Sequence, residues 1–165
     1  MRSIWFKTTA IAVICIFTSA EPQQAKEGTF KGAYYGYGTT KATQVGDDIF
    51  MAGDKDGLQL TDGFQDHRTL HCQELAEVAN GSEEVHGRWV GVDLAGDKFA
   101  LDFKTEKHPP DQKTFKGTST MTTGTGKYHG ITAGSEFVVH ANEFRPLAEG
   151  TVVNYVTFEG HYKLP

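Results

Sequence analysis

The stretch TFKGTSTMTTGTGKYHGITAGSEFVVHA, residues 114–141, places two runs rich in strand-forming residues on either side of a glycine-rich centre. Threonine, valine and aromatic residues are enriched in β-strands. Gly124 and Gly126 can adopt the positive φ that a tight turn requires. The stretch therefore predicts strands at 114–121 and 128–141, joined by a turn at Gly124-Thr125-Gly126.

The same alternation of strand-like runs and turn residues continues through the rest of the chain. Asn80-Gly81, the segment 95–97 and the segment 54–57 favour turns, whereas prolines make 108–111 and 145–147 loops. Regularly spaced short strands are typical of a sandwich or a barrel. Counting outward from 114–141, the sequence predicts eight strands, the other six being 30–39, 45–51, 68–78, 85–93, 98–104 and 152–163.

The length and the first residues predict one exported domain. A chain of 165 residues suits a single domain. Residues 1–20 carry Arg2 and Lys7, then an apolar run and a small-residue exit, the pattern of a secretory signal peptide. We expect a signal peptide at 1–20, a polar tether at 21–28 and a single β-barrel domain at 29–165, in a secreted or periplasmic protein.

Charge and motifs exclude several classes of function. The chain has 16 Lys and Arg against 21 Asp and Glu, a formal net charge of −5, which disfavours nucleic acid as a partner. The apolar run of residues 10–17 is shorter than the roughly 20 residues of a membrane span. The sequence contains no dinucleotide or phosphate-binding fingerprint and no nucleophile elbow, so we expect no cofactor.

One segment is ambiguous. Residues 67–81 can be read as a helix that stops at Asn80-Gly81, with His67, His71 and Glu74 on one face, or as a strand with Arg68, Cys72 and Glu74 in one row. Two histidines four apart on a helix could bind zinc, but the spacing lacks a metalloprotease pattern. On a strand they lie about 13 Å apart. We therefore predict no metal site.

A family resemblance favours the strand. The segment 122–131, with Gly124-Thr125-Gly126-Lys127 before Tyr128, resembles a hairpin of the allene oxide cyclase and dirigent protein group. The ending 152–163 resembles the closing strand of bacterial relatives. The resemblance implies an all-β, eight-stranded antiparallel barrel of calycin-like type. Plant members cyclise an unsaturated epoxide or steer the coupling of phenolic radicals. Because barrels of this group often form trimers, Tyr35 and Tyr37 are candidate contacts in a homo-oligomer.

The lumen of such a barrel is the predicted site. The more apolar row of each strand places Tyr34, Cys72 and Trp89 inside, and Arg68, Glu74 and Asn154 fall in the same rows. Polar groups in an apolar lumen cost roughly 1–3 kcal/mol each unless they find partners. Either Arg68 and Glu74 are paired internally through a neighbouring strand, or the polar groups anchor a ligand among apolar walls. The ligand-binding candidates are therefore Tyr34, Arg68, Cys72, Trp89 and Asn154.

Three functions remain open. The first is a barrel that binds a small apolar or aromatic molecule. The second is a cofactor-free cyclase or isomerase, with Glu74 as the catalytic acid or base, because an apolar lumen would raise the pKa of a carboxyl group. The third is an envelope protein whose barrel is solid. Cys72 is best interpreted as a small buried hydrophobic residue, since no base is placed beside it by the sequence.

Overall fold

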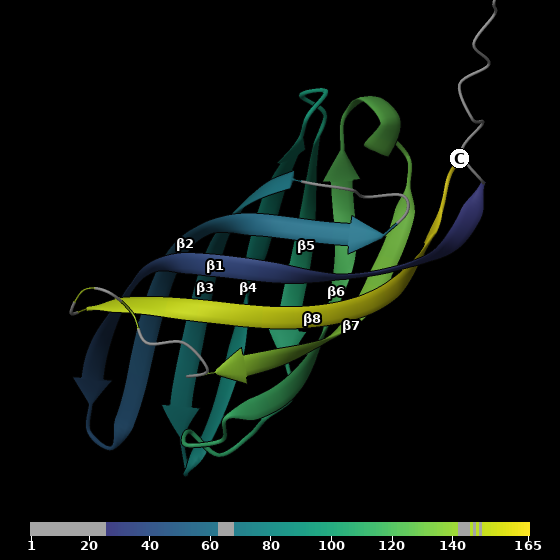
Figure 1. Cartoon of the computed structure of the whole chain (residues 1–165). Helices are drawn as coiled ribbons and strands as arrows, with labels where there is room; N and C mark the ends of the chain where they lie inside the picture. Colours follow the sequence, from purple (N-terminus) through teal and green to yellow (C-terminus); the bar gives the residue numbers. More distant parts are fainter. Residues whose placement is uncertain (1–25, 63–67, 142–145, 147, 149) are drawn as a thin grey trace, which may run out of the picture.

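The chain forms a closed barrel of eight antiparallel strands (Figure 1). The computed structural model describes residues 26–62, 68–141, 146, 148 and 150–165. Each strand pairs with its neighbours in sequence, and β1 closes the barrel on β8 from Glu27↔Lys163 to Thr39↔Thr151. The all-β barrel prediction is confirmed. The elements are β1 Glu27–Val45, β2 Asp48–Asp62, β3 Arg68–Ala79, β4 Ser82–Asp93, β5 Lys98–Thr105, β6 Thr114–Gly124, the 3-10 helix η1 Gly126–Tyr128, β7 Thr132–Ala141 and β8 Thr151–Lys163.

The first hairpin differs from the sequence-based prediction. The segment 54–57, predicted as a turn, lies inside β2, and the turn falls at Gly46-Asp47, where Gly46 has φ +64°. Gly57 pairs with Gly36 on β1 and with Leu70 on β3. Pairing on both sides outweighs the local preference of Asp and Gly for turns, so β1 and β2 are longer than predicted.

The ambiguous segment is a strand. Residues 68–79 form β3, which pairs with both β2 and β4, so the helical alternative is wrong. His71 lies outside, 2.9 Å from an Asp56 carboxylate oxygen, whereas Glu74 faces the lumen. His67 lies outside the described residues. Within the described part of the chain, no group of three or more His, Cys, Asp or Glu side chains is arranged to hold a metal ion.

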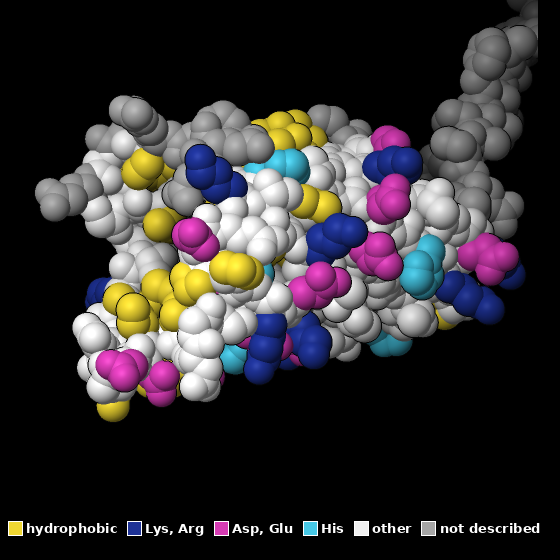
Figure 2. Space-filling model, turned by 90° about the horizontal axis from the view of Figure 1, so that it is seen from below, with side chains coloured by type: hydrophobic (Ala, Val, Ile, Leu, Met, Phe, Trp, Pro, Cys, Tyr) yellow, Lys and Arg dark blue, Asp and Glu magenta, His cyan; other side chains and the backbone are white. Residues whose placement is uncertain are grey.

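Alternation along the strands sorts apolar side chains into a core, as predicted. Tyr34 is buried, whereas its neighbours Tyr35 and Tyr37 are 44% and 46% exposed. Figure 2 shows the molecule from below, with hydrophobic side chains gathered toward the left and acidic and basic side chains interspersed over the right.

The predicted signal peptide and most of the tether lie outside the described residues. Within the described part of the chain, no helix has the length and apolar content that a membrane crossing requires, and η1 itself has three residues.

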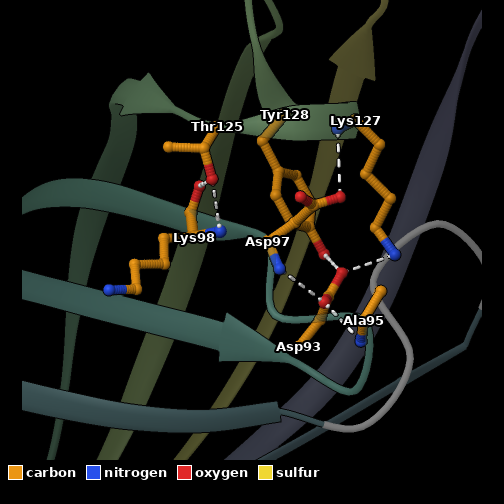
Figure 3. Close-up of polar contacts among 7 residues, drawn as sticks. All are labelled: Asp93, Ala95, Asp97, Lys98, Thr125, Lys127 and Tyr128. Atoms are coloured by element: carbon orange, nitrogen blue, oxygen red, sulfur yellow. Dashed lines mark hydrogen bonds and ion pairs between the residues drawn. The ribbon is translucent and has the colours of Figure 1, made fainter.

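A polar cluster around Asp93 and Tyr128 lies at one end of the barrel (Figure 3). The Asp93 carboxylate accepts hydrogen bonds from the Ala95 and Asp97 backbone N–H groups at 2.8 and 3.0 Å and from the Tyr128 hydroxyl at 3.0 Å. The Lys127 ammonium lies 2.5 Å from it. Burial opposes ionisation, but these hydrogen bonds outweigh it and lower the pKa of Asp93 to about 2. These contacts fasten η1 to the β4–β5 turn. Residues 128–131, predicted as the start of a strand, instead end η1 and form the turn after it, and β7 begins at Thr132.

Aromatic residues complete the filling at this end. The ring of Tyr128 is 1% exposed and lies 5.2 Å from the ring of Phe99. The guanidinium carbon of Arg68 is 4.5 Å from the centre of the Phe99 ring, a cation–π arrangement. Space for a ligand within the lumen therefore lies toward the other end.

Candidate functional site: a cavity at the open end of the barrel

A cavity of about 490 Å³ occupies the other end of the lumen. It is formed by the last residues of β1, β3, β5 and β7 and the first residues of β2, β4, β6 and β8. It extends to Pro110 and Gln112, which are exposed in the β5–β6 loop, so it is open to solvent. Its walls are mainly apolar, and they include Ala76, Val85, Trp89, Phe103, Phe137 and Val156.

An ion pair stands on one wall of the cavity. The Lys55 ammonium contacts the Glu74 carboxylate, and their side chains are only 5% and 14% exposed. Gly53 makes room for this pair, because a Cβ atom there would lie 2.8 Å from Cγ of Glu74. Lys55 thus supplies the partner that Glu74 requires in an apolar setting.

Cys72 lies next to this pair, behind the residues that line the cavity. The Trp89 indole N–H donates to its sulfur at 2.9 Å, and the sulfur is 3.8 Å from a Glu74 oxygen. Burial, reinforced by the negative charge of Glu74, raises the pKa of the Cys72 thiol to about 12. The thiol is therefore protonated at neutral pH, which fits the interpretation as a buried hydrophobic residue.

Tyr34 lies beside Trp89, with the two ring centres 5.7 Å apart. Its side chain is 1% exposed and lines the cavity, yet its hydroxyl has no hydrogen-bond partner among the described residues. Glycines leave space for it, because a Cβ at Gly36 would lie 2.4 Å from the hydroxyl oxygen. Burial raises the pKa of Tyr34, so the hydroxyl keeps its proton and can donate it in a hydrogen bond.

The structure brings four of the six predicted site residues to the cavity: Tyr34, Glu74, Trp89 and Asn154. Cys72 lies behind the wall, and Arg68 lies at the filled end, over Phe99. The alternative of an Arg68–Glu74 pair is wrong for Glu74, whose ion-pair partner is Lys55.

Sequence reasoning missed two charged residues of the cavity, Lys55 and Glu83. Lys55 was missed because the sequence predicts a turn at 54–57, where no inward row of a strand is expected. Glu83 could have been found by extending the inward row of β4 back from Trp89 and Val85. Burial raises the pKa of Glu83, and the nearby His108 opposes that effect.

Comparison with known proteins supports the fold. The sequence matches no known protein family and no curated protein. Among solved structures, the pterocarpan synthase dirigent protein GePTS1 aligns with 87% of this chain and 90% of its own, at a TM-score of 0.51 and 7% sequence identity. The chain therefore has a dirigent-like fold: a closed, all-β barrel of eight antiparallel strands. At this identity the likeness concerns the fold alone.

Proposed function

We propose that the lumen binds a small apolar or aromatic molecule. The observation that carries the proposal is the cavity of about 490 Å³, which is walled by aromatic and aliphatic side chains and open at one end. Small-molecule sites commonly combine apolar walls with a few polar groups that orient the ligand. The cavity also argues against a solid barrel.

The apolar character of the walls indicates how a ligand would be held. Apolar burial at roughly 25 cal/mol per Å² would supply most of the affinity.

Displacement of a neutral fluorescent probe, N-phenyl-1-naphthylamine, tests the proposal. We expect the wild-type protein to bind the probe and Ala76→Phe, which fills the cavity, to lose binding at least tenfold. Ala52→Phe adds the same ring to the exposed face of β2 and should bind normally. Circular dichroism checks that both variants are folded. Equal binding by the Ala76→Phe variant, or no binding by the wild type, would overturn the proposal.

A second candidate is a cofactor-free cyclase or isomerase. It is favoured by the Glu74 carboxylate, which is held by Lys55 at the mainly apolar wall of the cavity. Such a carboxylate can stabilise positive charge that develops on a substrate. Incubation with unsaturated epoxides and with phenolic radicals would reveal turnover that falls in Glu74→Gln. Binding of these compounds without conversion would reject the enzyme.

We also propose that the protein is exported, to the periplasm or the medium, because residues 1–20 have the pattern of a signal peptide. N-terminal sequencing of the protein recovered from each fraction would show cleavage after Ala20. Recovery of the uncleaved chain from the cytoplasm would contradict export.

A further inference from the structure

The cavity is lined by more negatively charged than positively charged side chains. Glu74 and Glu83 contribute two carboxylates, and Lys55 is the one ammonium or guanidinium among the described lining residues. Lys55 is already committed to Glu74, and its side chain is 5% exposed. The cavity therefore has an excess negative charge that no lining cation neutralises.

That excess resides on Glu83. Its side chain is half-buried, lines the cavity and forms no hydrogen bond or ion pair among the described residues. Its backbone is fixed, because its N–H and C=O groups both bond to His108, at 2.7 and 3.0 Å. The backbone thus keeps Glu83 at the mouth, beside His108, while its carboxylate forms no direct ion pair among the described residues.

The environment of Glu83 favours a cation from outside. The burial that raises its pKa also removes water that would otherwise solvate the charge. His108 opposes this effect, Glu74 adds to it, and Lys55 opposes it by less than Glu74 adds. A bound cation would compensate for the lost solvation of the Glu83 carboxylate and weaken its repulsion with Glu74.

The adjacent walls suit an organic cation rather than a bare ion. Trp89, Phe103, Phe115 and Phe137 all line the cavity. The faces of aromatic rings attract ammonium groups, and their area favours an apolar body. The described residues offer no cluster of ligands for a metal ion.

We infer that the molecule bound in the lumen is an amphiphilic amine, an apolar or aromatic body with one protonated nitrogen that pairs with Glu83 at the mouth. The inference rests on the proposed function and specifies its ligand. A carboxylate ligand would face two like charges, and a neutral ligand would leave Glu83 unpaired.

Calorimetry with three probes of one size tests this: 3-phenylpropylamine, 3-phenyl-1-propanol and 3-phenylpropanoate. We expect the amine to bind at least tenfold more tightly than the alcohol and the carboxylate not to bind. In Glu83→Gln, the affinity for the amine should fall to that for the alcohol. The matched control is Glu84→Gln, which removes the next carboxylate of β4 on the opposite face and should leave the preference intact.

The outcomes separate this inference from the proposed function. If N-phenyl-1-naphthylamine binds but the amine has no advantage over the alcohol, the lumen binds ligands and the inference fails. The same holds if Glu83→Gln keeps the amine preference. If neither the neutral probe nor any of the three compounds binds, both proposals are overturned.

Discussion

Gly126 combines two constraints at one residue. Its φ is +50°, and a Cβ atom there would lie 1.9 Å from a carboxylate oxygen of Asp97. Valine at positive φ costs about 1–2 kcal/mol from backbone strain alone. We predict that Gly126→Val lowers the stability by more than this, because Asp97 must also move and its hydrogen bond from the Lys127 N–H is lost.

Gly46 provides the control for that prediction. Its φ is +64°, but no atom lies within 4 Å of where its Cβ would be. Gly46→Val should therefore show the backbone strain without the clash. Thermal unfolding of the two variants measures the difference, and equal losses of melting temperature would contradict a role for Asp97.

Cys72 should be inert in the folded protein. Because burial raises its thiol pKa to about 12, almost none is ionised at pH 8, and the thiolate is the reactive form. We predict that iodoacetamide labels Cys72 only after denaturation. Peptide mass mapping distinguishes it from Cys15, and rapid labelling of the native protein at Cys72 would show the prediction wrong.

Individual residues were predictable where one row of a strand is consistently apolar. Alternation places Tyr34, Cys72 and Trp89 inside, and all three are buried. Lys55 was not, because a buried lysine becomes plausible only once Glu74 is known to lie beside it. That neighbour is set by the register between two strands, which local sequence does not encode.

At the scale of elements, the Lys55–Glu74 pair links β2 to β3. Removing one partner of a buried pair leaves an uncompensated charge and costs about 3–5 kcal/mol. Glu74 borders the open cavity, so for Lys55→Met we expect a loss near the low end, about 3 kcal/mol. Urea denaturation measures it.

The double variant Lys55→Met/Glu74→Leu removes both charges and should recover most of the lost stability. An apolar pair of similar volume often replaces a buried ion pair at little cost. The two single variants are Lys55→Met and Glu74→Leu. If the stability lost in the double variant equals the sum of their separate losses, the two side chains do not interact.

The elements themselves were largely predictable, because turn residues such as Asn80-Gly81 mark their ends. Asn80 and Gly81 have φ of 53° and 74°, as the predicted turn requires. The residues 54–57 failed as a turn because β1 and β3 pair with β2 on both sides there. Long-range pairing of this kind overrides local propensity.

At the scale of the whole molecule, Asp93, at the filled end, makes the stability of the folded protein depend on pH in the acid range. Its pKa falls from an ordinary value near 3.8 to about 2 on folding. The folded state thus binds the proton less tightly, so the contribution is complete above about pH 5 and is lost as the pH falls toward 2. Because Lys127 is partly exposed, we expect about 1–2 kcal/mol.

Asp93→Asn isolates that contribution. The variant should be less stable than the wild type at pH 6, and the difference should shrink steadily between pH 4 and pH 2. Chemical denaturation at several pH values measures it. A difference that is independent of pH would show that the charge of Asp93 does not stabilise the barrel.

Barrel closure was predictable from eight strands and the family resemblance, but the division of the lumen was not. The same inward rows supply both Phe99, in the filled end, and Phe103, in the cavity wall. Which end is filled depends on Tyr128, which enters from η1 rather than from a strand. Side-chain volumes must be summed around the whole barrel before a void can be located.

The plug made by Asp93, Lys127 and Tyr128 also has a kinetic consequence. A ligand bound in the cavity can leave only through the open end by which it entered. A second molecule therefore cannot displace it from the opposite side. The residence time of a bound molecule should then be independent of the concentration of a competing compound.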